Sequence, residues 1–248
     1  MTNSPTTAYG SDMDVVRTAI SGLVEDVFGS LGRIGAATTT LWDRREGAVR
    51  AADLAELREV ILTELDGRSV PLHGAGLVLA PGALADQDRH LEWWRSADKS
   101  GGVPKQSRFD LNPDSDYFYD YSTMEWFVAP RDRDTRWVAG PYLDYTGVDL
   151  YICTFAVPVR WVGPDGTFLG IAGADVTLAT LDAALMPALR AGGRPVALVN
   201  AEGRVIVGNH PDYVTGSRLK RTAIVSGEQV PGTQWTLVAL DAADVQHG

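Results

Sequence analysis

Residues 178–207, LATLDAALMPALRAGGRPVALVNAEGRVIV, carry a helix, a stop signal and a hairpin in succession. Four leucines fall on one side of the expected helix at 178–190, and Gly192-Gly193 supplies its C-terminal stop. Two apolar runs, 196–200 and 205–207, then flank a four-residue turn. The stretch therefore predicts a helix that follows one sheet in the sequence and a hairpin that begins a second sheet.

Short apolar runs separated by turn residues lie on both sides of this stretch. The strands expected from them are 74–80, 90–94, 125–129, 136–139, 151–158, 168–176, 222–225 and 234–239. Nearer the N-terminus, apolar residues spaced by three and four from Val16 to Ile34 predict a long amphipathic helix, and residues 51–65 predict a second one. Helices, strands, a helix and strands again indicate an α+β fold with antiparallel sheets.

This order also predicts how the chain is divided. We expect an N-terminal helical region at 1–66, a larger sheet module with its connecting helix at 67–192, and a small second sheet module at 193–248. The glycines within the first helix weaken it, so it needs a partner surface. We expect that surface to come from packing within the chain and from a homodimer contact through the N-terminal helix.

Composition excludes several classes of function. The 248 residues hold 22 Lys plus Arg against 32 Asp plus Glu, a formal charge of −10, which argues against binding to nucleic acid or to an anionic membrane. There is no run of 18 apolar residues and no basic-then-apolar leader. The single cysteine, Cys153, rules out an internal disulfide framework and is expected to be buried. These features predict a soluble, cytoplasmic protein.

Signals for catalysis are weak. No glycine-rich phosphate loop and no Gly-x-Ser-x-Gly element occurs, and the four histidines show no metal-ligand spacing. Carboxylates are numerous, but nothing selects a catalytic pair. We therefore expect no metal, no cofactor and no enzymatic activity.

Aromatic and acidic residues are concentrated between residues 114 and 151. The aromatic members are Tyr117, Phe118, Tyr119, Tyr121, Trp126, Phe127, Trp137, Tyr142 and Tyr145, and the acidic residues interleaved with them include Asp120, Glu125, Asp144 and Asp149. Aromatic side chains in strands commonly build a core. On a strand, however, Trp126 and Phe127 would point to opposite faces, so that one of them would line something else. Aromatic faces with carboxylates are the chemistry of a cage for a cation.

The order of these motifs resembles the double-Cache sensor domains. The resemblance rests on Tyr119, Glu125-Trp126-Phe127, Gly140-Pro141-Tyr142-Leu143-Asp144, Asp165-Gly166, Phe168-Leu169-Gly170 and Asp175-Val176, and on the hairpin at 198–206. It implies a long N-terminal helix, a larger ligand-binding PAS-like module and a smaller second one. Many members bind amino acids, with aspartates holding the ammonium group and an Arg and a Trp holding the carboxylate.

The resemblance also implies the ligand-binding residues. Tyr119 takes the place of the first aromatic residue and Trp126-Phe127 that of the aromatic pair, while Tyr142, Asp144 and Asp175 take the remaining places. Tyr121 and Glu125 join them as members of the aromatic and acidic cluster. Met124, however, stands where the family has its carboxylate-binding Arg, and Met neither donates a hydrogen bond nor neutralises a carboxylate.

The retained aspartates and the missing Arg predict a ligand that has an amine but no carboxylate: a biogenic amine, a polyamine or a quaternary ammonium compound. Two alternatives stay open: an amino-acid-binding Cache sensor and a small enzyme that acts on an amine. A protein whose sheet groove binds a peptide would not be expected to have the dense aromatic and acidic cluster. A sensor without an output region also implies a separate signalling or regulatory partner.

Overall fold

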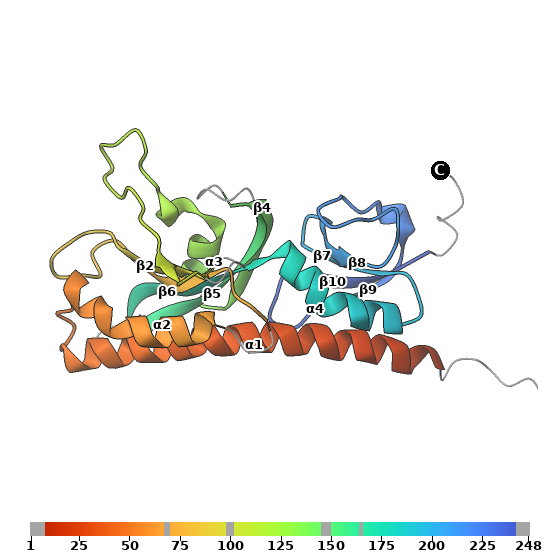
Figure 1. The fold of residues 1–248 in the computed structure, drawn as a ribbon, viewed down its shortest axis with the longest axis horizontal. Coiled ribbons are helices and arrows are strands. Elements are labelled where there is room, and N and C mark those ends of the chain that lie inside the picture. Colours follow the sequence, from red (N-terminus) through yellow and green to blue (C-terminus); the bar gives the residue numbers. More distant parts are fainter. Residues whose placement is uncertain (1–7, 67–69, 98–101, 145–149, 164–165, 242–248) are drawn as a thin grey trace, which may run out of the picture. The chain divides into compact units, whose positions relative to one another are not determined.

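The computed structural model describes residues 8–66, 70–97, 102–144, 150–163 and 166–241, and most of its helices and strands are labelled in Figure 1. Helical elements are α1 (Ala8–Arg44), η1 (Ala51–Leu57), α2 (Arg58–Leu65), η2 (Tyr121–Thr123), α3 (Glu125–Arg133), α4 (Leu178–Ala191) and η3 (Arg221–Ala223), where η marks a 3₁₀ helix. The strands of the first sheet are β1 (Gly74–Leu79), β2 (Leu91–Arg95), β3 (Lys105–Gln106), β4 (Trp137–Leu143), β5 (Tyr151–Trp161) and β6 (Thr167–Thr177). The strands of the second sheet are β7 (Val196–Val199), β8 (Val205–Gly208), β9 (Ile224–Gln229) and β10 (Thr236–Leu240).

The two antiparallel sheets confirm the predicted α+β class. The larger sheet has the order β3-β2-β1-β6-β5-β4, and the smaller has the order β8-β7-β10-β9. In the larger one, β1 pairs antiparallel with both β2 and β6. Gly74 therefore stands in one row with Arg95 and Asp175, and Gly76 stands in one row with Trp93 and Gly173. These two rows position the candidate site.

The predicted N-terminal helix is present and longer than expected. The apolar positions that predicted it are buried: Val16, Ile20, Leu23, Val27, Leu31 and Ile34. The helix expected at 51–65 begins as the 3₁₀ helix η1 and becomes α-helical only at Arg58. Cys153 is buried, as expected.

Contacts divide the chain into two compact units. Unit 1 comprises Met1–Glu25, Gly140–Cys153 and Thr177–Gly248, and unit 2 comprises Asp26–Ala139 and Thr154–Val176. Unit 1 holds the smaller sheet, whose core includes Ala197, Val199, Val205, Tyr213, Val238 and Leu240. The boundaries at residues 66 and 192 follow the order of the elements and stay a prediction.

Residues 125–129 form a helix, so the predicted strand there is wrong. Asp120 caps the preceding turn by accepting a hydrogen bond from the Ser122 amide at 3.2 Å. Extended Met124 then begins α3, and Asp134, with a positive φ of 50°, ends it. A short apolar run without alternation fits a buried helix as well as a strand. Trp126 and Phe127 are consequently both buried, at 8% and 0% exposure, so the inference of opposite faces is also wrong.

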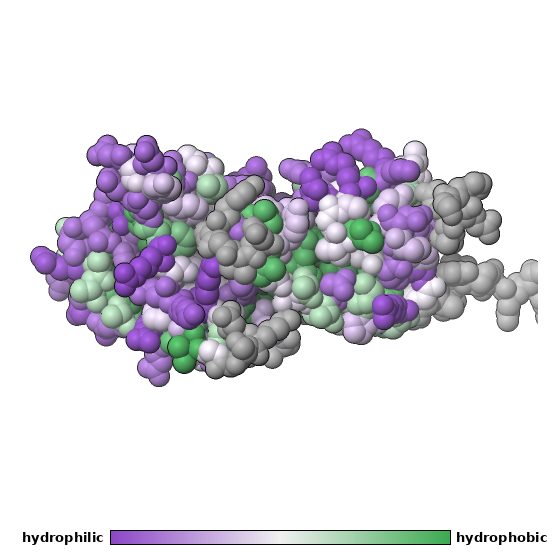
Figure 2. Space-filling view, turned by 45° about the horizontal axis from the view of Figure 1, so that its top comes forward, coloured by the Kyte–Doolittle hydropathy of each residue, from purple (hydrophilic) through white to green (hydrophobic). Residues whose placement is uncertain are grey.

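The drawn face of the molecule is largely hydrophilic (Figure 2). On the face drawn in Figure 2, hydrophilic residues predominate over both units, and hydrophobic ones form smaller separate areas. Among the helices of the described residues, none combines the length and the hydropathy that crossing a bilayer would need.

Candidate functional site

The carboxylate of Asp175 is the centre of the candidate site in unit 2. It lies near the end of β6 with a relative exposure of 9%, and its Oδ1 accepts a hydrogen bond of 2.6 Å from the Thr154 hydroxyl. The Asp175 carbonyl accepts a hydrogen bond of 2.8 Å from the His73 amide, which fixes the backbone at the strand end. A carboxylate so far removed from water is costly unless positive charge or hydrogen-bond donors surround it.

The sheet beside Asp175 is lined by glycine. Gly74 is its cross-strand neighbour on β1, and Gly173 precedes it by two residues on β6 and thus lies on the same face. Neither glycine places a side chain over the sheet. The indole of Trp93 from β2 occupies that space instead: a methyl group on Gly74 would lie 2.8 Å from its Nε1, and one on Gly173 would lie 3.1 Å from its Cζ3.

Two of the aromatic residues predicted to bind ligand are part of the core of unit 2. Tyr121 is fully buried, and its hydroxyl donates a hydrogen bond of 2.7 Å to the carbonyl of Leu79. Burial raises the pKa of Tyr121 to about 12. The ring of Phe127 packs edge-to-face against Tyr121 at 5.3 Å and Phe168 at 5.8 Å between centroids. Trp126 meets Phe127 edge-on at 6.4 Å.

Tyr119 and Glu125 lie nearer the surface. The ring of half-buried Tyr119 stacks on Phe109 with 5.0 Å between centroids. Glu125 is exposed in the first turn of α3, and its carboxylate accepts a hydrogen bond of 3.0 Å from Trp137 Nε1. Because water already solvates Glu125, its carboxylate has less need of a cation than that of Asp175.

Tyr142 and Asp144 belong to unit 1 and are described there. Tyr142 is half-buried on β4, and its Cδ1 would lie 3.2 Å from a methyl group on Gly140. Asp144 is 5% exposed, and its amide donates a hydrogen bond of 2.8 Å to the carbonyl of Leu150. Two members of the predicted aromatic and acidic cluster, Tyr145 and Asp149, lie outside the described residues.

Three residues that share the sheet face of Asp175 or hydrogen-bond to it are absent from the predicted ligand-binding set: Trp93, Arg95 and Thr154. Their placement relative to Asp175 depends on strand register, which the sequence does not reveal. The aromatic pair Trp93-Trp94 within an expected strand was the one available signal, because one of two adjacent strand residues points to each face.

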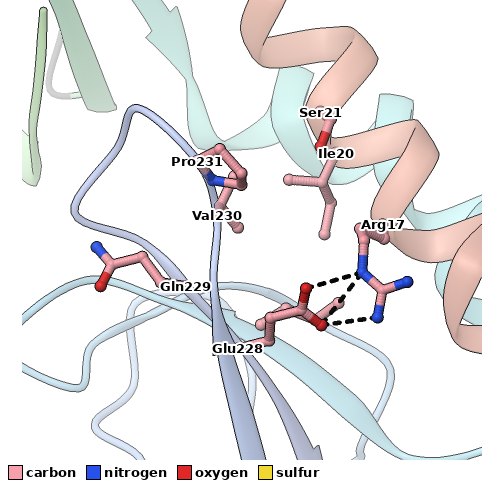
Figure 3. Close-up of a pocket in the computed structure, with 8 residues that line it drawn as sticks. Arg17, Ile20, Ser21, Glu228, Gln229, Val230 and Pro231 are labelled. Atoms are coloured by element: carbon pink, nitrogen blue, oxygen red, sulfur yellow. Dashed lines mark hydrogen bonds and ion pairs between the residues drawn. The ribbon is translucent and has the colours of Figure 1, made fainter.

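A small pocket lies in unit 1, and none of these residues lines it (Figure 3). The guanidinium of Arg17 on α1 donates two hydrogen bonds to the Glu228 carboxylate on β9, with Nε–Oε1 at 3.0 Å and Nη2–Oε2 at 2.7 Å. Ile20 and Val230 line the same hollow, which has room for roughly one water molecule. Within the described ranges, no group of three or more His, Cys, Asp or Glu side chains is placed to hold a metal ion.

No family model and no curated protein matches the chain. Several solved structures do match it. The ligand-binding domain of the Campylobacter jejuni chemoreceptor Tlp3 in complex with 4-methylisoleucine matches with a TM-score of 0.63 and 13% identity, covering 97% of this chain and 94% of that one. The ligand-binding domain of the Pseudomonas aeruginosa amino acid chemoreceptor PctC in complex with GABA matches with a TM-score of 0.57 and 19% identity, covering 94% and 97%.

A third match is the "extracellular domain of the putative histidine kinase mmHK1S-Z3", with a TM-score of 0.64, 13% identity and coverage of 98% of this chain and 100% of that one. Together these matches show that the chain has the double-Cache fold along nearly its whole length.

The matches contradict the predicted cytoplasmic location. The similar structures include extracellular domains of histidine kinases, so this fold occurs in proteins outside the cytoplasm. The prediction rested on the lack of a leader and of a membrane-spanning run. Neither lack fixes the compartment of a sensor fold, so that reasoning was wrong.

Proposed function

We propose that the chain is a ligand-binding sensor domain that recognises a small cationic amine and does not catalyse a reaction. The observation that carries this proposal is the carboxylate of Asp175, 9% exposed beside an indole and a glycine-lined sheet. A cation placed there would be attracted both by that carboxylate and by the face of the indole. The absence of Arg at position 124 supports an amine over an α-amino acid.

One observation favours the alternative, an amino acid. Arg95 stands in the same row as Gly74 and Asp175, on the same face of the sheet. The two Cα atoms are two strand spacings apart, about 10 Å. A ligand with well-separated ammonium and carboxylate groups would suit such a pair, and the PctC domain is a solved complex with GABA, which has this chemistry.

Calorimetric titration with ethanolamine, putrescine, choline, L-alanine and GABA tests both versions. The amine proposal expects at least one of the first three compounds to bind. Its affinity should fall at least tenfold in Asp175→Asn, and by less in Glu125→Gln, whose side chain is exposed. Binding of L-alanine or GABA alone, weakened by Arg95→Gln, would replace it with the amino-acid alternative. Binding of none of the five would overturn the proposal.

Mass spectrometry of the same ligand after incubation with the protein tests the enzyme alternative. The sensor proposal expects the ligand to be recovered unchanged, and a new product would contradict it.

The sensor proposal also includes a homodimer through α1 and a separate signalling partner. For Tyr142 and Asp144 the proposed ligand contacts rest on the sequence pattern alone, and Asp144→Ala is their direct test.

A further inference from the structure

We propose that Trp93 is a ligand-binding residue, whose indole face receives the cationic nitrogen of a ligand held by Asp175. The inference rests on the proposed function, because it assumes that Asp175 binds a cation. It adds a residue from β2 to the site and names the ligand class as ammonium compounds, including methylated ones.

The register of three strands places the indole next to the carboxylate. Trp93, Gly76 and Gly173 form one row, and the neighbouring row holds Gly74 and Asp175. The indole nevertheless approaches Gly74 as well as Gly173, with its Nε1 edge over the former and its six-membered ring over the latter. Both glycines are immediate neighbours of Asp175 on the sheet. The indole therefore lies beside that carboxylate.

The next residue along the strand shows that this placement is specific to one face. Trp94 points to the opposite side of the sheet, where the Arg58 guanidinium of α2 lies 4.7 Å from its ring centroid. Its Nε1 donates a hydrogen bond of 2.7 Å to the buried carboxylate of Glu92. Trp94 thus has a structural role beneath α2, while Trp93 shares the face of Asp175.

The glycines explain why the indole lies where it does. A methyl group at 2.8 Å or 3.1 Å would push the ring away from Gly74 or Gly173, so the two residues without side chains are what admit it. Trp offers the most favourable aromatic face to a cation, and the attraction grows where water is excluded. Trp93 is only 7% exposed, so a cation at its face would be largely desolvated.

The two roles of the site predict different sensitivities. A carboxylate attracts any ammonium, whereas an indole face also suits methylated ammonium, which has few or no N–H groups to donate. Loss of the indole should therefore weaken choline binding more than ethanolamine binding. Loss of the carboxylate should weaken both.

The experiment is titration of Trp93→Leu, Trp93→Phe and Trp94→Leu with ethanolamine, putrescine and choline. We expect Trp93→Leu to weaken the affinity for the tightest-binding of these three amines by about tenfold to thirtyfold, the scale of a desolvated cation–π contact. Trp93→Phe should recover part of that loss. Trp94→Leu, the matched control on the other face, should lower the unfolding temperature but leave affinity within about twofold of wild type.

Two outcomes separate this inference from the proposed function. Equal affinity in Trp93→Leu and wild type, with binding lost in Asp175→Asn, would overturn the inference and leave the proposed function standing. No binding of any amine to wild type would overturn both. Should Trp93→Leu not fold, Gly173→Ala tests the same contact by displacing the ring, and unchanged affinity there would count equally against the inference.

Discussion

The hydroxyl of Tyr121 connects a buried side chain to the end of β1 and makes stability depend on pH. Burial raises its pKa from an ordinary value of about 10 to about 12. Between these values the unfolded chain loses the proton and the folded chain keeps it. This contribution is therefore complete below pH 10 and is lost as the pH rises toward 12, by at most about 1.4 kcal/mol per pH unit.

Tyr121→Phe removes this dependence. We expect a cost of about 1 kcal/mol at neutral pH, because the Leu79 carbonyl loses its donor. Above pH 10, the free energy of unfolding should fall less steeply than in wild type, as measured by urea denaturation from pH 8 to pH 11. Tyr117→Phe is the control, since that ring is 86% exposed. Parallel slopes for Tyr121→Phe and wild type would contradict the assignment.

Single residues also show how far a sequence pattern can locate a site. Asp175 was predicted from its place in a family pattern, and its burial is consistent with that place. Tyr121 was included for its type, yet its hydroxyl is bonded to a carbonyl within the core. The sequence pattern does not select Trp93 as a ligand-binding residue, because strand register determines which residues surround it. A shift of one residue in the register would place Trp94 on the face of Asp175 instead.

At the scale of elements, one ion pair joins α1 to α2 within unit 2. Both carboxylate oxygens of Glu64 accept hydrogen bonds from Arg33, at 2.6 and 2.7 Å. The Glu64 side chain is 3% exposed and that of Arg33 is 41% exposed. The hydrogen bonds to Glu64 raise the pKa of Arg33. Arg33 therefore neutralises the buried carboxylate of Glu64 where α1 meets α2.

Removing the cation should therefore be costly. We expect Arg33→Ala to lower the free energy of unfolding by about 2 kcal/mol, less than for a fully buried pair because the Arg33 side chain is 41% exposed to water. Arg44→Ala breaks the exposed Arg44–Glu56 pair nearby and should cost less than about 1 kcal/mol. Denaturant unfolding of the two variants measures the difference. Similar losses of unfolding free energy in the two variants would show that the burial of Glu64 adds nothing to the stabilisation by the Arg33–Glu64 pair.

Elements with a clear apolar period were predicted well, and those without one were not. The stripe from Val16 to Ile34 is buried as its spacing indicated. The run at 126–129 has no period, and it forms a helix that begins after extended Met124 and ends at left-handed Asp134. Residue type predicts neither boundary, because Met is not a preferred capping residue and Asp is equally common in loops.

At the scale of the whole molecule, the burial of the α1 stripe changes which face can join two copies of the chain. The outward face of α1 presents small residues, including Gly22 and Gly32, where an added methyl group would meet nothing within 4 Å. A contact through this face buries few apolar atoms, and stable interfaces need roughly 1,000 Å². The proposed α1 homodimer should therefore be weak.

Sedimentation equilibrium over a wide concentration range tests this dimer. We expect a concentration-dependent shift from monomer to dimer, abolished by Gly32→Arg, because a charged side chain would separate the two helices. The control is Val225→Arg on β9, the edge strand of the smaller sheet, where all six residues are exposed. Disruption by Val225→Arg but not by Gly32→Arg would move the interface from the helix to that edge, since an unpaired strand edge is itself a template for association. A wild-type chain that stays monomeric throughout would remove the homodimer from the proposed function and leave ligand binding as a property of single chains.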